Sequence, residues 1–411
     1  MPAVRLAARW VLPVDGPPIA AGAVLIGADG RVAAIGPDAS VPAPPGVPQR
    51  RFPDGAIAPG FVNVHTHLEL SGFEGQVEDD DFAGWIRRLR ELKDRRSRDE
   101  YRAAARRGIR DAWAMGVTTV ADTGDRGVVL EALAECGGSG VVYQEVFGPH
   151  PDQLETSLRD LKAKVAEQRG FESERLRLGV SPHAPYTVSA PLYRAVSGYA
   201  RSERLPIAVH LAESPAETQL LRAAAGPFAD AWGRRGIPLP PLPGRSPVAW
   251  LDAEGVLGPE TLCIHLVQVD AEDVGRLAGA GVAVAHCPGS NRRHGHGDAP
   301  LRRLRAAGLR VGVGTDSVAS VASVDLRAEA RAARALAELS WDDALALVTY
   351  EGAKALGLER QVGTLTAGKW GDAVVIRLTD TRPPVEQVMS GENAVVATYV
   401  GGRPVFEGIR A

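Results

Sequence analysis

Two histidines two residues apart, His65 and His67, are of the type and spacing that begin a metal site. They end the apolar run of Phe61, Val62 and Val64, which is typical of a buried strand. Because side chains two residues apart on a strand point to the same face, both imidazoles are expected to converge. The alternative is a histidine pair that only packs or forms hydrogen bonds at the end of a strand.

The other histidines also gather at the ends of predicted strands. Six of the nine histidines follow this rule, namely His65, His67, His183, His210, His265 and His286. Asp316 joins them at the end of the last apolar run, where a buried carboxylate is costly unless it meets a cation or a protonated partner. The competing interpretation is a set of separately satisfied core histidines. Convergence at strand ends, where barrel enzymes carry their catalytic groups, argues against it.

Three imidazoles and one carboxylate would form a mixed nitrogen and oxygen site suited to zinc or ferrous iron, with positions left open for water. A water on such a metal has a pKa near neutrality and is a nucleophile at cellular pH. It needs a proton carrier, and Glu213 lies three residues after His210, on the same side if a helical turn begins there. The alternative is that Glu213 only complements a helix dipole.

The residues between these donors alternate apolar β runs with helical runs, a pattern that predicts repeated βα units. Helical periodicity is clearest over Asp99–Met115, Leu154–Gln168, Pro215–Ala225 and Asp325–Leu336. Eight strands predict a closed (β/α)8 barrel of the α/β class, whose strand ends would bring the donors together. These strands are Phe61–His65, Val117–Ala121, Gly140–Val146, Leu176–Val180, Pro206–Val209, Thr261–His265, Val282–His286 and Leu309–Gly314.

The two ends of the chain have β character of a different kind. Short β runs separated by turn clusters occupy Val4–Leu12, Ala23–Ile26 and Val32–Ile35, and further runs occupy Gly371–Ile376 and Ala394–Val400 before a Gly401-Gly402 turn. We predict a small β-sandwich domain built from residues 1–56 plus 362–411, around a barrel over residues 57–361. The long connection from Val209 to Thr261 contains PLPPLPGRSP and predicts an irregular loop near the barrel mouth.

Bulk composition fits an ordinary globular protein. Hydrophobic residues make up 45% and charged residues 24%, and 47 basic against 50 acidic residues give a net charge of -3. This balance favours neither nucleic acid nor a membrane surface as a partner, and the absence of a long apolar run predicts a cytoplasmic protein. Three scattered cysteines, Cys136, Cys263 and Cys287, indicate small core residues rather than disulfides or thiolate ligands. A homodimer is a candidate oligomeric state that the sequence does not decide.

The order and spacing of six motifs resemble the amidohydrolase superfamily, in its cytosine-deaminase-like aminohydrolase branch. The motifs are HTH at 65–67, HAPYT at 183–187, HLAE at 210–213, His265, HCPGSN at 286–291 and GTDSVAS at 314–320. AIAPGFVNVHTH and VGTLTAGKWGDAVVI are similar to the segments where that family's chain passes between its small β domain and its barrel. The resemblance implies a barrel enzyme and covers nearly the whole chain.

The resemblance also implies roles for single residues. One divalent ion, zinc or alternatively iron, would be held by His65, His67, His210 and Asp316. Glu213 would be the proton shuttle, His265 would polarise the hydroxide or the attacked centre, and Asp316 would also accept the water's proton. Dinuclear relatives carry a carboxylated lysine at the end of the fourth strand, and Leu176–Pro182 contains no lysine. The resemblance therefore favours deamination of an aromatic C–NH2 carbon over hydrolysis of an amide by two metals.

The substrate is the least determined feature. His183 resembles a residue that contacts the bound base, and Glu69 and Trp85 lie where the first barrel loop could reach a sugar or a ring, although Trp85 could be a plain helix anchor. The HTHLELS, SN and GTDSVAS segments are most similar to 6-aminodeoxyfutalosine deaminases of menaquinone synthesis, with adenosine-type and S-adenosylhomocysteine-type deaminases as alternatives. Ser290, Asn291 and Arg292 are further expected substrate contacts.

The loop after Asn291 departs from the family pattern. Its residues, Arg292 to His296, are basic, which would suit a substrate that carries a carboxylate, such as the benzoate of aminodeoxyfutalosine. The alternative is a solvated surface loop. Other functions that the sequence leaves open are a cyclic amidohydrolase or another C–N hydrolase, such as an imidazolonepropionase-like or chlorohydrolase-like enzyme, and a barrel that has become a scaffold. The scaffold is disfavoured because every expected ligand is present.

Overall fold

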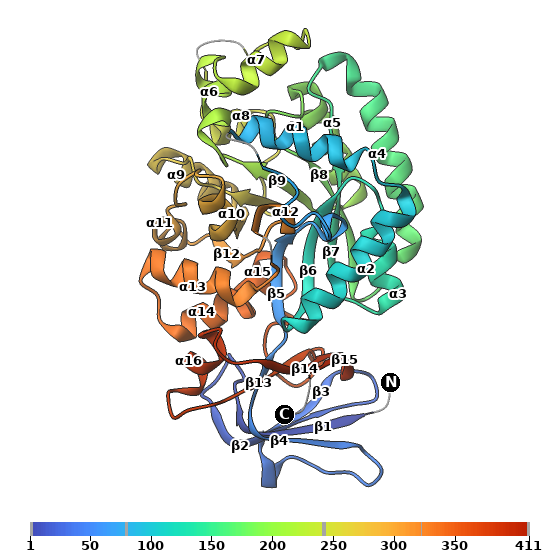
Figure 1. Ribbon diagram of the computed structural model, residues 1–411, viewed down its shortest axis with the longest axis vertical. Coiled ribbons are helices and arrows are strands. Elements are labelled where there is room, and N and C mark those ends of the chain that lie inside the picture. The colour runs from blue at the N-terminus through green and yellow to red at the C-terminus, as the bar shows by residue number, and fades with distance from the viewer. Residues whose placement is uncertain (1–2, 79–80, 241–243, 322, 409–411) are drawn as a thin grey trace.

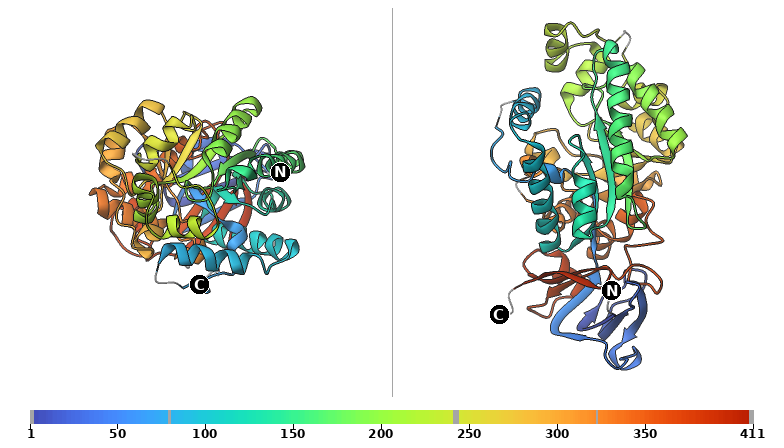
Figure 2. Two further views of the ribbon diagram at one scale, coloured as in Figure 1. Left: turned by 90° about the horizontal axis from the view of Figure 1, so that it is seen from above. Right: turned by 90° about the vertical axis from the view of Figure 1, so that its right-hand side faces the viewer.

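A computed structural model describes residues 3–78, 81–240, 244–321 and 323–408 of the chain. Two bodies lie one above the other: a barrel surrounded by helices, and a small β domain that contains both chain ends (Figure 1). The side view in Figure 2 shows the same arrangement. The first and last parts of the sequence therefore lie side by side, as predicted.

The eight predicted barrel strands are all confirmed, and they are hydrogen-bonded in chain order from β5 to β12. Neighbouring strands pair in parallel. A backbone hydrogen bond, 3.0 Å long, from the Asp316 N–H to the His65 carbonyl oxygen brings the end of the last strand beside the first. The strands are β5 (Phe61–Thr66), β6 (Val117–Gly124), β7 (Gly140–Val146), β8 (Leu176–Pro182), β9 (Ile207–Leu211), β10 (Thr261–His265), β11 (Ala283–His286) and β12 (Arg310–Val313).

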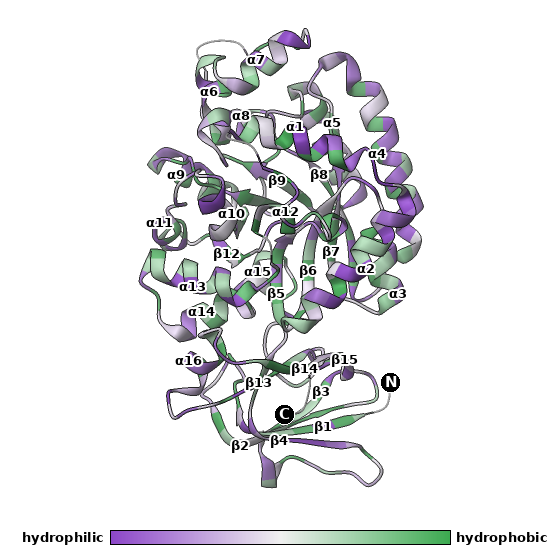
Figure 3. Cartoon of the chain, viewed as in Figure 1, coloured by the Kyte–Doolittle hydropathy of each residue, from purple (hydrophilic) through white to green (hydrophobic). Residues whose placement is uncertain are grey.

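Burial explains why these runs form the barrel. Every residue of β5, β6, β7, β9, β10 and β11 is buried, because one face of each strand meets the barrel interior and the other meets the surrounding helices. Figure 3 shows the strands as mainly apolar, whereas the outer helices carry both apolar and polar residues. The predicted continuous apolar runs are therefore the signature of strands buried on both faces.

The helices lie mainly around the outside of the barrel, and the four predicted from periodicity are confirmed. One of them, α2, begins at a capping box in which the Ser97 hydroxyl accepts from the Glu100 N–H and the Glu100 carboxylate accepts from the Ser97 N–H. The first eight helices are α1 (Phe82–Lys93), α2 (Arg98–Ala114), α3 (Val129–Cys136), α4 (Leu154–Gln168), α5 (Ala190–Glu203), α6 (Pro215–Ala223), α7 (Pro227–Arg234) and α8 (Pro247–Ala253). The others are α9 (Ala271–Ala280), α10 (Pro288–Arg293), α11 (Leu301–Ala306), α12 (Val318–Val321), α13 (Leu326–Ala337), α14 (Trp341–Leu347), α15 (Tyr350–Ala355) and α16 (Pro384–Met389).

The small β domain is a mixed sheet of seven strands drawn from both chain ends, in the order β15-β14-β13-β4-β1-β2-β3. The five predicted runs correspond to β1 (Val4–Val11), β2 (Ile19–Ile26), β3 (Val32–Pro37), β13 (Ala373–Arg377) and β14 (Val395–Val400). Two strands were not predicted, β4 (Gln49–Pro59) and β15 (Arg403–Glu407). β4 pairs with both β1 and β13 and so joins the two chain ends, and it continues past residue 56 to lead directly into β5.

The long connection after β9 is more regular than the sequence indicated. It contains α6, which the periodicity predicted, and also α7 and α8, where the expectation of an irregular loop is wrong. Serine N-caps begin two of these helices, because the Ser214 and Ser246 hydroxyls accept from backbone N–H groups in the first turn. Residues 241–243 of the Pro-rich segment lie outside the described residues. Within the described parts of the chain, no helix is both long and apolar enough to cross a membrane.

Candidate active site

The four predicted metal ligands converge at the carboxyl ends of three barrel strands. His65 lies on β5 and His67 directly after it, His210 lies on β9, and Asp316 lies in the segment after β12. The ring centroid of His65 lies 4.8 Å from that of His67 and 5.0 Å from that of His210. Asp316 Oδ1 lies 3.4 Å from Nε2 of both His65 and His67. Residues more than 250 positions apart therefore face one point, as the barrel prediction required.

Hydrogen bonds fix the orientation of these donors. The Nδ1 atom of His210 lies 3.1 Å from the backbone oxygen of His183, an acceptor that requires Nδ1–H and leaves Nε2 with a free lone pair. Asp316 Oδ1 accepts from the Ser317 N–H at 2.6 Å, and its Oδ2 accepts from the Ser290 hydroxyl. Such outer hydrogen bonds hold metal ligands in place and adjust their basicity.

The backbone at Asp316 is strained in a way that fits a functional position. Its φ angle is +61°, in the left-handed region that residues other than glycine seldom occupy. Strain of this kind persists where the surrounding structure imposes it, and it is concentrated at active sites. Asn63 supplies part of that constraint, because its Oδ1 accepts from the Thr315 N–H at 3.1 Å and its Nδ2 donates to the Thr315 hydroxyl.

The charges of the cluster fit a divalent cation. Burial lowers the pKa of His65 to about 4, and both its ring nitrogens are buried without a hydrogen-bond partner among the described residues. Burial alone would lower the pKa of His67, but Asp316, Glu145 and Asp122 outweigh it and raise that pKa to about 9. Burial would raise the pKa of Asp316, yet the neighbouring imidazoles His65 and His67 hold it well below its usual value. These residues thus combine an unpartnered neutral imidazole with a carboxylate that attracts positive charge, which is the donor set of a zinc site.

Glu213 and His265 lie beside this cluster. Glu213 Oε1 is 3.5 Å from His265 Nε2, and the other ring nitrogen of His265 pairs with Asn291 Oδ1 at 2.9 Å. Asn291 therefore aims the free nitrogen of His265 at Glu213. Burial would raise the pKa of Glu213, but His265 and His296 outweigh it and lower that pKa to about 2. The carboxylate is thus ionised and can accept a proton.

Tyr186 and His296, which the sequence did not indicate as site residues, also contribute to the surroundings of Glu213. The Tyr186 hydroxyl donates to Glu213 Oε2 at 3.2 Å, and His296 Nε2 lies 3.6 Å from Glu213 Oε1. Tyr186 lies within the HAPYT motif, so its place in that motif could have identified it as a site residue. His296 belongs to the basic loop, and residue type alone does not distinguish a surface histidine from a buried one.

His183 lies next to the cluster and forms one wall of the mouth with residues from β7. Its ring centroid is 4.6 Å from that of His210 and 4.9 Å from that of Phe147, an exposed ring at the end of β7. Its Nδ1 pairs with the Thr187 hydroxyl at 2.8 Å, which leaves Nε2 free, 4.0 Å from Glu145. This position is compatible with the predicted contact to a substrate.

Other predicted substrate contacts have structural partners. Glu69 is buried, and its two carboxylate oxygens accept from the backbone N–H groups of Asp125 and Arg126 at 3.1 and 3.2 Å. This arrangement supports the alternative in which Glu69 braces its neighbours. Trp85 is buried on α1 among Leu70, Phe73 and Val77, which supports its interpretation as a helix anchor.

Ser290, Asn291 and Arg292 differ in what they face. Ser290 and Asn291 are buried and bond to Asp316 and His265, so each acts on a predicted site residue. The side chain of Arg292 is exposed on α10, at the end of the barrel where the site lies.

The sixth strand-end histidine, His286, is fully buried, and burial lowers its pKa to about 3.

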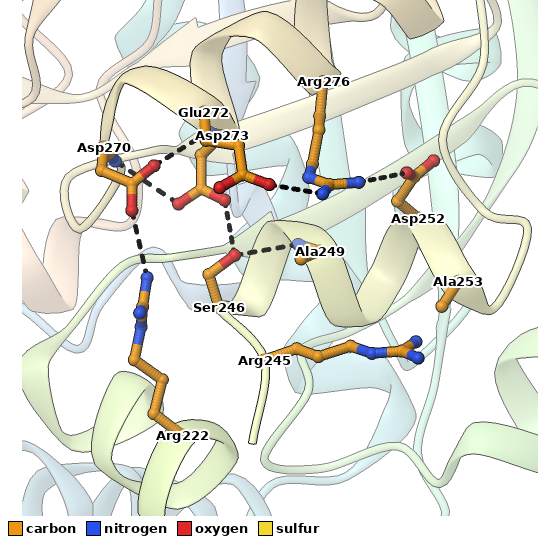
Figure 4. Close-up of a pocket in the computed structure, with 10 residues that line it drawn as sticks. All are labelled: Arg222, Arg245, Ser246, Ala249, Asp252, Ala253, Asp270, Glu272, Asp273 and Arg276. Atoms are coloured by element: carbon orange, nitrogen blue, oxygen red, sulfur yellow. Dashed lines mark hydrogen bonds and ion pairs between the residues drawn. The ribbon is translucent and has the colours of Figure 1, made fainter. Parts of the chain in front are cut away.

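A separate cavity of about 480 Å³ lies on the outside of the barrel among α6, α8 and α9 (Figure 4). It contains none of the predicted site residues. Most of its charged side chains pair with one another, as in the Arg222–Asp270 and Arg276–Glu272 contacts. It offers no imidazole or convergent donor set, so the chemistry lies at the strand ends.

Comparisons with known proteins identify the family of the chain. Residues 56–405 match the model of the amidohydrolase family. The chain is 35% identical to the aminodeoxyfutalosine deaminase of Deinococcus radiodurans over 75% of this chain and 76% of that protein. It is 30% identical to the 5-methylthioadenosine/S-adenosylhomocysteine deaminase of Moorella thermoacetica over 91% of this chain and 85% of that protein. An adenosine deaminase from Xanthomonas campestris, solved with bound zinc, has the same fold, with a TM-score of 0.83, 23% identity and coverage of 98% and 92% of the two chains.

Proposed function

This chain belongs to the amidohydrolase family and is a hydrolytic deaminase, and we propose that it acts on the exocyclic amine of an adenine-type nucleoside. The observation that carries this proposal is the position of Glu213. Its ionised carboxylate lies beside His265 and next to the convergent donors His65, His67, His210 and Asp316. A proton carrier beside a cation site is the arrangement that hydrolytic deamination requires.

We propose that the four convergent donors hold one zinc ion. Three imidazoles and one carboxylate are ligands that zinc accepts, and an adenosine deaminase of the same fold was solved with zinc. When bound, such an ion supplies Lewis acidity, which lowers the pKa of water toward neutrality. Ferrous iron is the alternative that the same donors allow.

The residues of the site divide the proton transfers of the reaction among them. Glu213 accepts one proton of the attacking water as the water oxygen bonds to the carbon that bears the amine, and it delivers this proton to the adjacent ring nitrogen. Asp316 accepts the second proton from that oxygen, and this proton passes through Glu213 to the amine, so that the C–N bond breaks and ammonia leaves. His265 donates to Asn291 Oδ1 through Nδ1–H, and when its Nε2 also carries a proton it donates from Nε2 toward the developing charge. Water enters, ammonia leaves, and an amino group is replaced by a carbonyl oxygen.

We further propose 6-aminodeoxyfutalosine as the substrate, within menaquinone synthesis. The similarity to the Deinococcus radiodurans enzyme supports this choice, and so does the exposed Arg292 at the mouth, which could meet the benzoate. 5-Methylthioadenosine and S-adenosylhomocysteine are the competing substrates, because the Moorella thermoacetica relative matches more of the chain.

Ammonia release measured over a panel of amines tests the proposal. The panel contains 6-aminodeoxyfutalosine, 5-methylthioadenosine, S-adenosylhomocysteine, adenosine, cytosine and guanine, and the zinc-loaded protein is the enzyme. We expect the highest kcat/KM for 6-aminodeoxyfutalosine. A higher value for a thioether nucleoside would reassign the substrate, and no release from any purine nucleoside would overturn the proposed function.

A further inference from the structure

His296 is a buried histidine to which the proposed mechanism gives no role. Its side chain is only 2% exposed, and its Nε2 has no hydrogen-bond partner among the described residues. A buried ring nitrogen without a partner is costly unless a group nearby satisfies it in the working state of the protein. The polar group that Nε2 faces is Glu213 Oε1, at 3.6 Å.

The backbone around His296 holds the ring in this direction. Its N–H donates to the Asn291 carbonyl oxygen at 2.9 Å, and its own carbonyl oxygen accepts from the Gln268 side chain at 2.6 Å. The Gln268 N–H in turn donates to the carbonyl oxygen of Ala212, the residue before Glu213, at 2.7 Å. Gln268 therefore fixes the backbone of His296 relative to the backbone that carries Glu213.

Aromatic packing holds the other side of the ring. The centroid of His296 lies 4.5 Å from that of Phe82 on α1 in a T-shaped contact, and 5.4 Å from that of His294 in a stacked one. Phe82 also contacts Tyr186 and Phe228, so α1 and α7 cover the Glu213 side of the site with aromatic rings. The ring of His296 thus has little freedom to turn away from the carboxylate.

The two imidazoles on Glu213 Oε1 approach it from different elements. His265 comes from the end of β10 and lies 3.5 Å away, and His296 comes from the loop after α10 and lies 3.6 Å away. Both separations exceed a normal hydrogen bond by a few tenths of an ångström, and contacts of this kind in catalytic sites shorten when substrate binds. A carboxylate can only accept, so an Nε2–H on His296 would be satisfied by it.

We propose that His296 is a positioning residue for the proton shuttle: its Nε2–H donates to Glu213 Oε1 and holds the carboxylate in the orientation in which it meets His265. This inference deepens the proposed function and rests on the role given there to Glu213. His296 itself transfers no proton. With the donor removed, the carboxylate can rotate, so the chemical step slows while the metal ligands remain in place.

Kinetics of three variants test the proposal with 6-aminodeoxyfutalosine or whichever nucleoside the wild type deaminates. His296→Phe keeps a ring against Phe82 but removes the donor, and we expect kcat to fall about 10- to 100-fold, as for other residues that orient a catalytic group. KM and zinc content should stay near the wild-type values. His296→Gln retains an N–H donor and should recover part of kcat. The matched control is His150→Phe, because the partly exposed His150 ring accepts from the Asp152 N–H instead, and its kcat should match the wild type.

Imidazole nitrogen NMR gives a readout that does not need turnover. In the ¹⁵N-labelled zinc protein, the His296 signals are those lost in His296→Phe, and we expect an Nε2–H tautomer whose Nε2 resonance moves in Glu213→Gln. A wild-type kcat in His296→Phe, an equal loss in His150→Phe or an unmoved resonance would overturn the role of His296. Failure of the wild type to deaminate any nucleoside would instead overturn the proposed function, and the NMR result would still decide the contact.

Discussion

The backbone N–H of Asp316 donates to the backbone oxygen of His65 at 3.0 Å, and this bond brings the two ends of the barrel sheet together. The same contact sets Asp316 Oδ1 3.4 Å from the Nε2 atom of His65. Closure of the barrel and assembly of the proposed metal site therefore depend on one pairing between segments far apart in sequence. A change that disturbs the closure of the barrel should also disturb the proposed metal site, and a change at the metal site should also affect the stability of the barrel.

Removal of the metal should therefore abolish activity and also reduce stability. We expect dialysis against a chelator to lower ammonia release to background and to lower Tm, because an ion that binds only the folded state stabilises it. One equivalent of zinc per chain should restore both. Full activity in protein shown by elemental analysis to be free of metal would exclude the proposed site.

Glu213→Gln should remove turnover without removing the metal. The amide cannot accept and return a proton, and the loss of a general acid and base costs about 10²- to 10⁴-fold in kcat. Zinc content and Tm should remain close to the wild-type values, since Glu213 is not one of the proposed ligands. The control is Glu203→Gln at an exposed position on α5. A normal kcat in Glu213→Gln would assign the shuttle elsewhere.

Arg292 offers a test of the charge of the substrate. If its exposed guanidinium meets the benzoate of 6-aminodeoxyfutalosine, Arg292→Ala should raise KM for that substrate and leave KM for adenosine unchanged. Arg303→Ala on α11 is the control, because it removes an exposed arginine from a different helix. An unchanged KM for the benzoate substrate would mean that Arg292 belongs to a solvated surface.

Lys93→Met should destabilise the fold. Lys93 Nζ lies 2.5 Å from Asp125 Oδ1 and 3.8 Å from Glu69 Oε1, and Lys93→Met takes this ammonium group away from two largely buried carboxylates. Loss of one partner of a buried ion pair costs about 3–5 kcal/mol, which denaturant unfolding would measure. Arg87→Met, on the same helix but in an exposed pair with Glu91, should change stability by less than about 1 kcal/mol. Equal effects of the two substitutions would contradict the importance of burial here.

The stability of the protein should fall between about pH 4.5 and pH 8, in part because of Glu217. Burial raises the pKa of Glu217 from its ordinary value of 4.5 to about 8, although backbone N–H groups of Glu213 and Ala212 oppose the shift. In this window the folded protein holds a proton that the unfolded chain has released, so stability decreases as the pH rises. Urea unfolding of the zinc-loaded protein at several pH values should show a smaller slope for Glu217→Gln. If the unfolding free energies of the wild type and of Glu217→Gln changed in parallel with pH, Glu217 would not titrate in this range.

The sequence predicted the barrel because its strands are buried on both faces and so appear as continuous apolar runs. It missed β4 and β15, since β4 begins with the polar segment Gln49–Asp54 and β15 contains Pro404, and neither is an apolar run. It also predicted a loop where α7 and α8 form, because short helices between proline-rich segments leave little periodicity to detect.

Residue type and spacing alone determined which side chains could bind a metal and where along the chain they stand. Six histidines and Asp316 became candidates in this way, because they lie at or just after predicted strand ends, and such ends meet at one rim of a barrel. The resemblance to the amidohydrolase superfamily then selected His65, His67, His210 and Asp316 among them. Only the tertiary structure decided what each polar group faces. It directs His296 toward Glu213 and both oxygens of Glu69 toward backbone amides, because those contacts join loops from different strands and depend on how the loops pack.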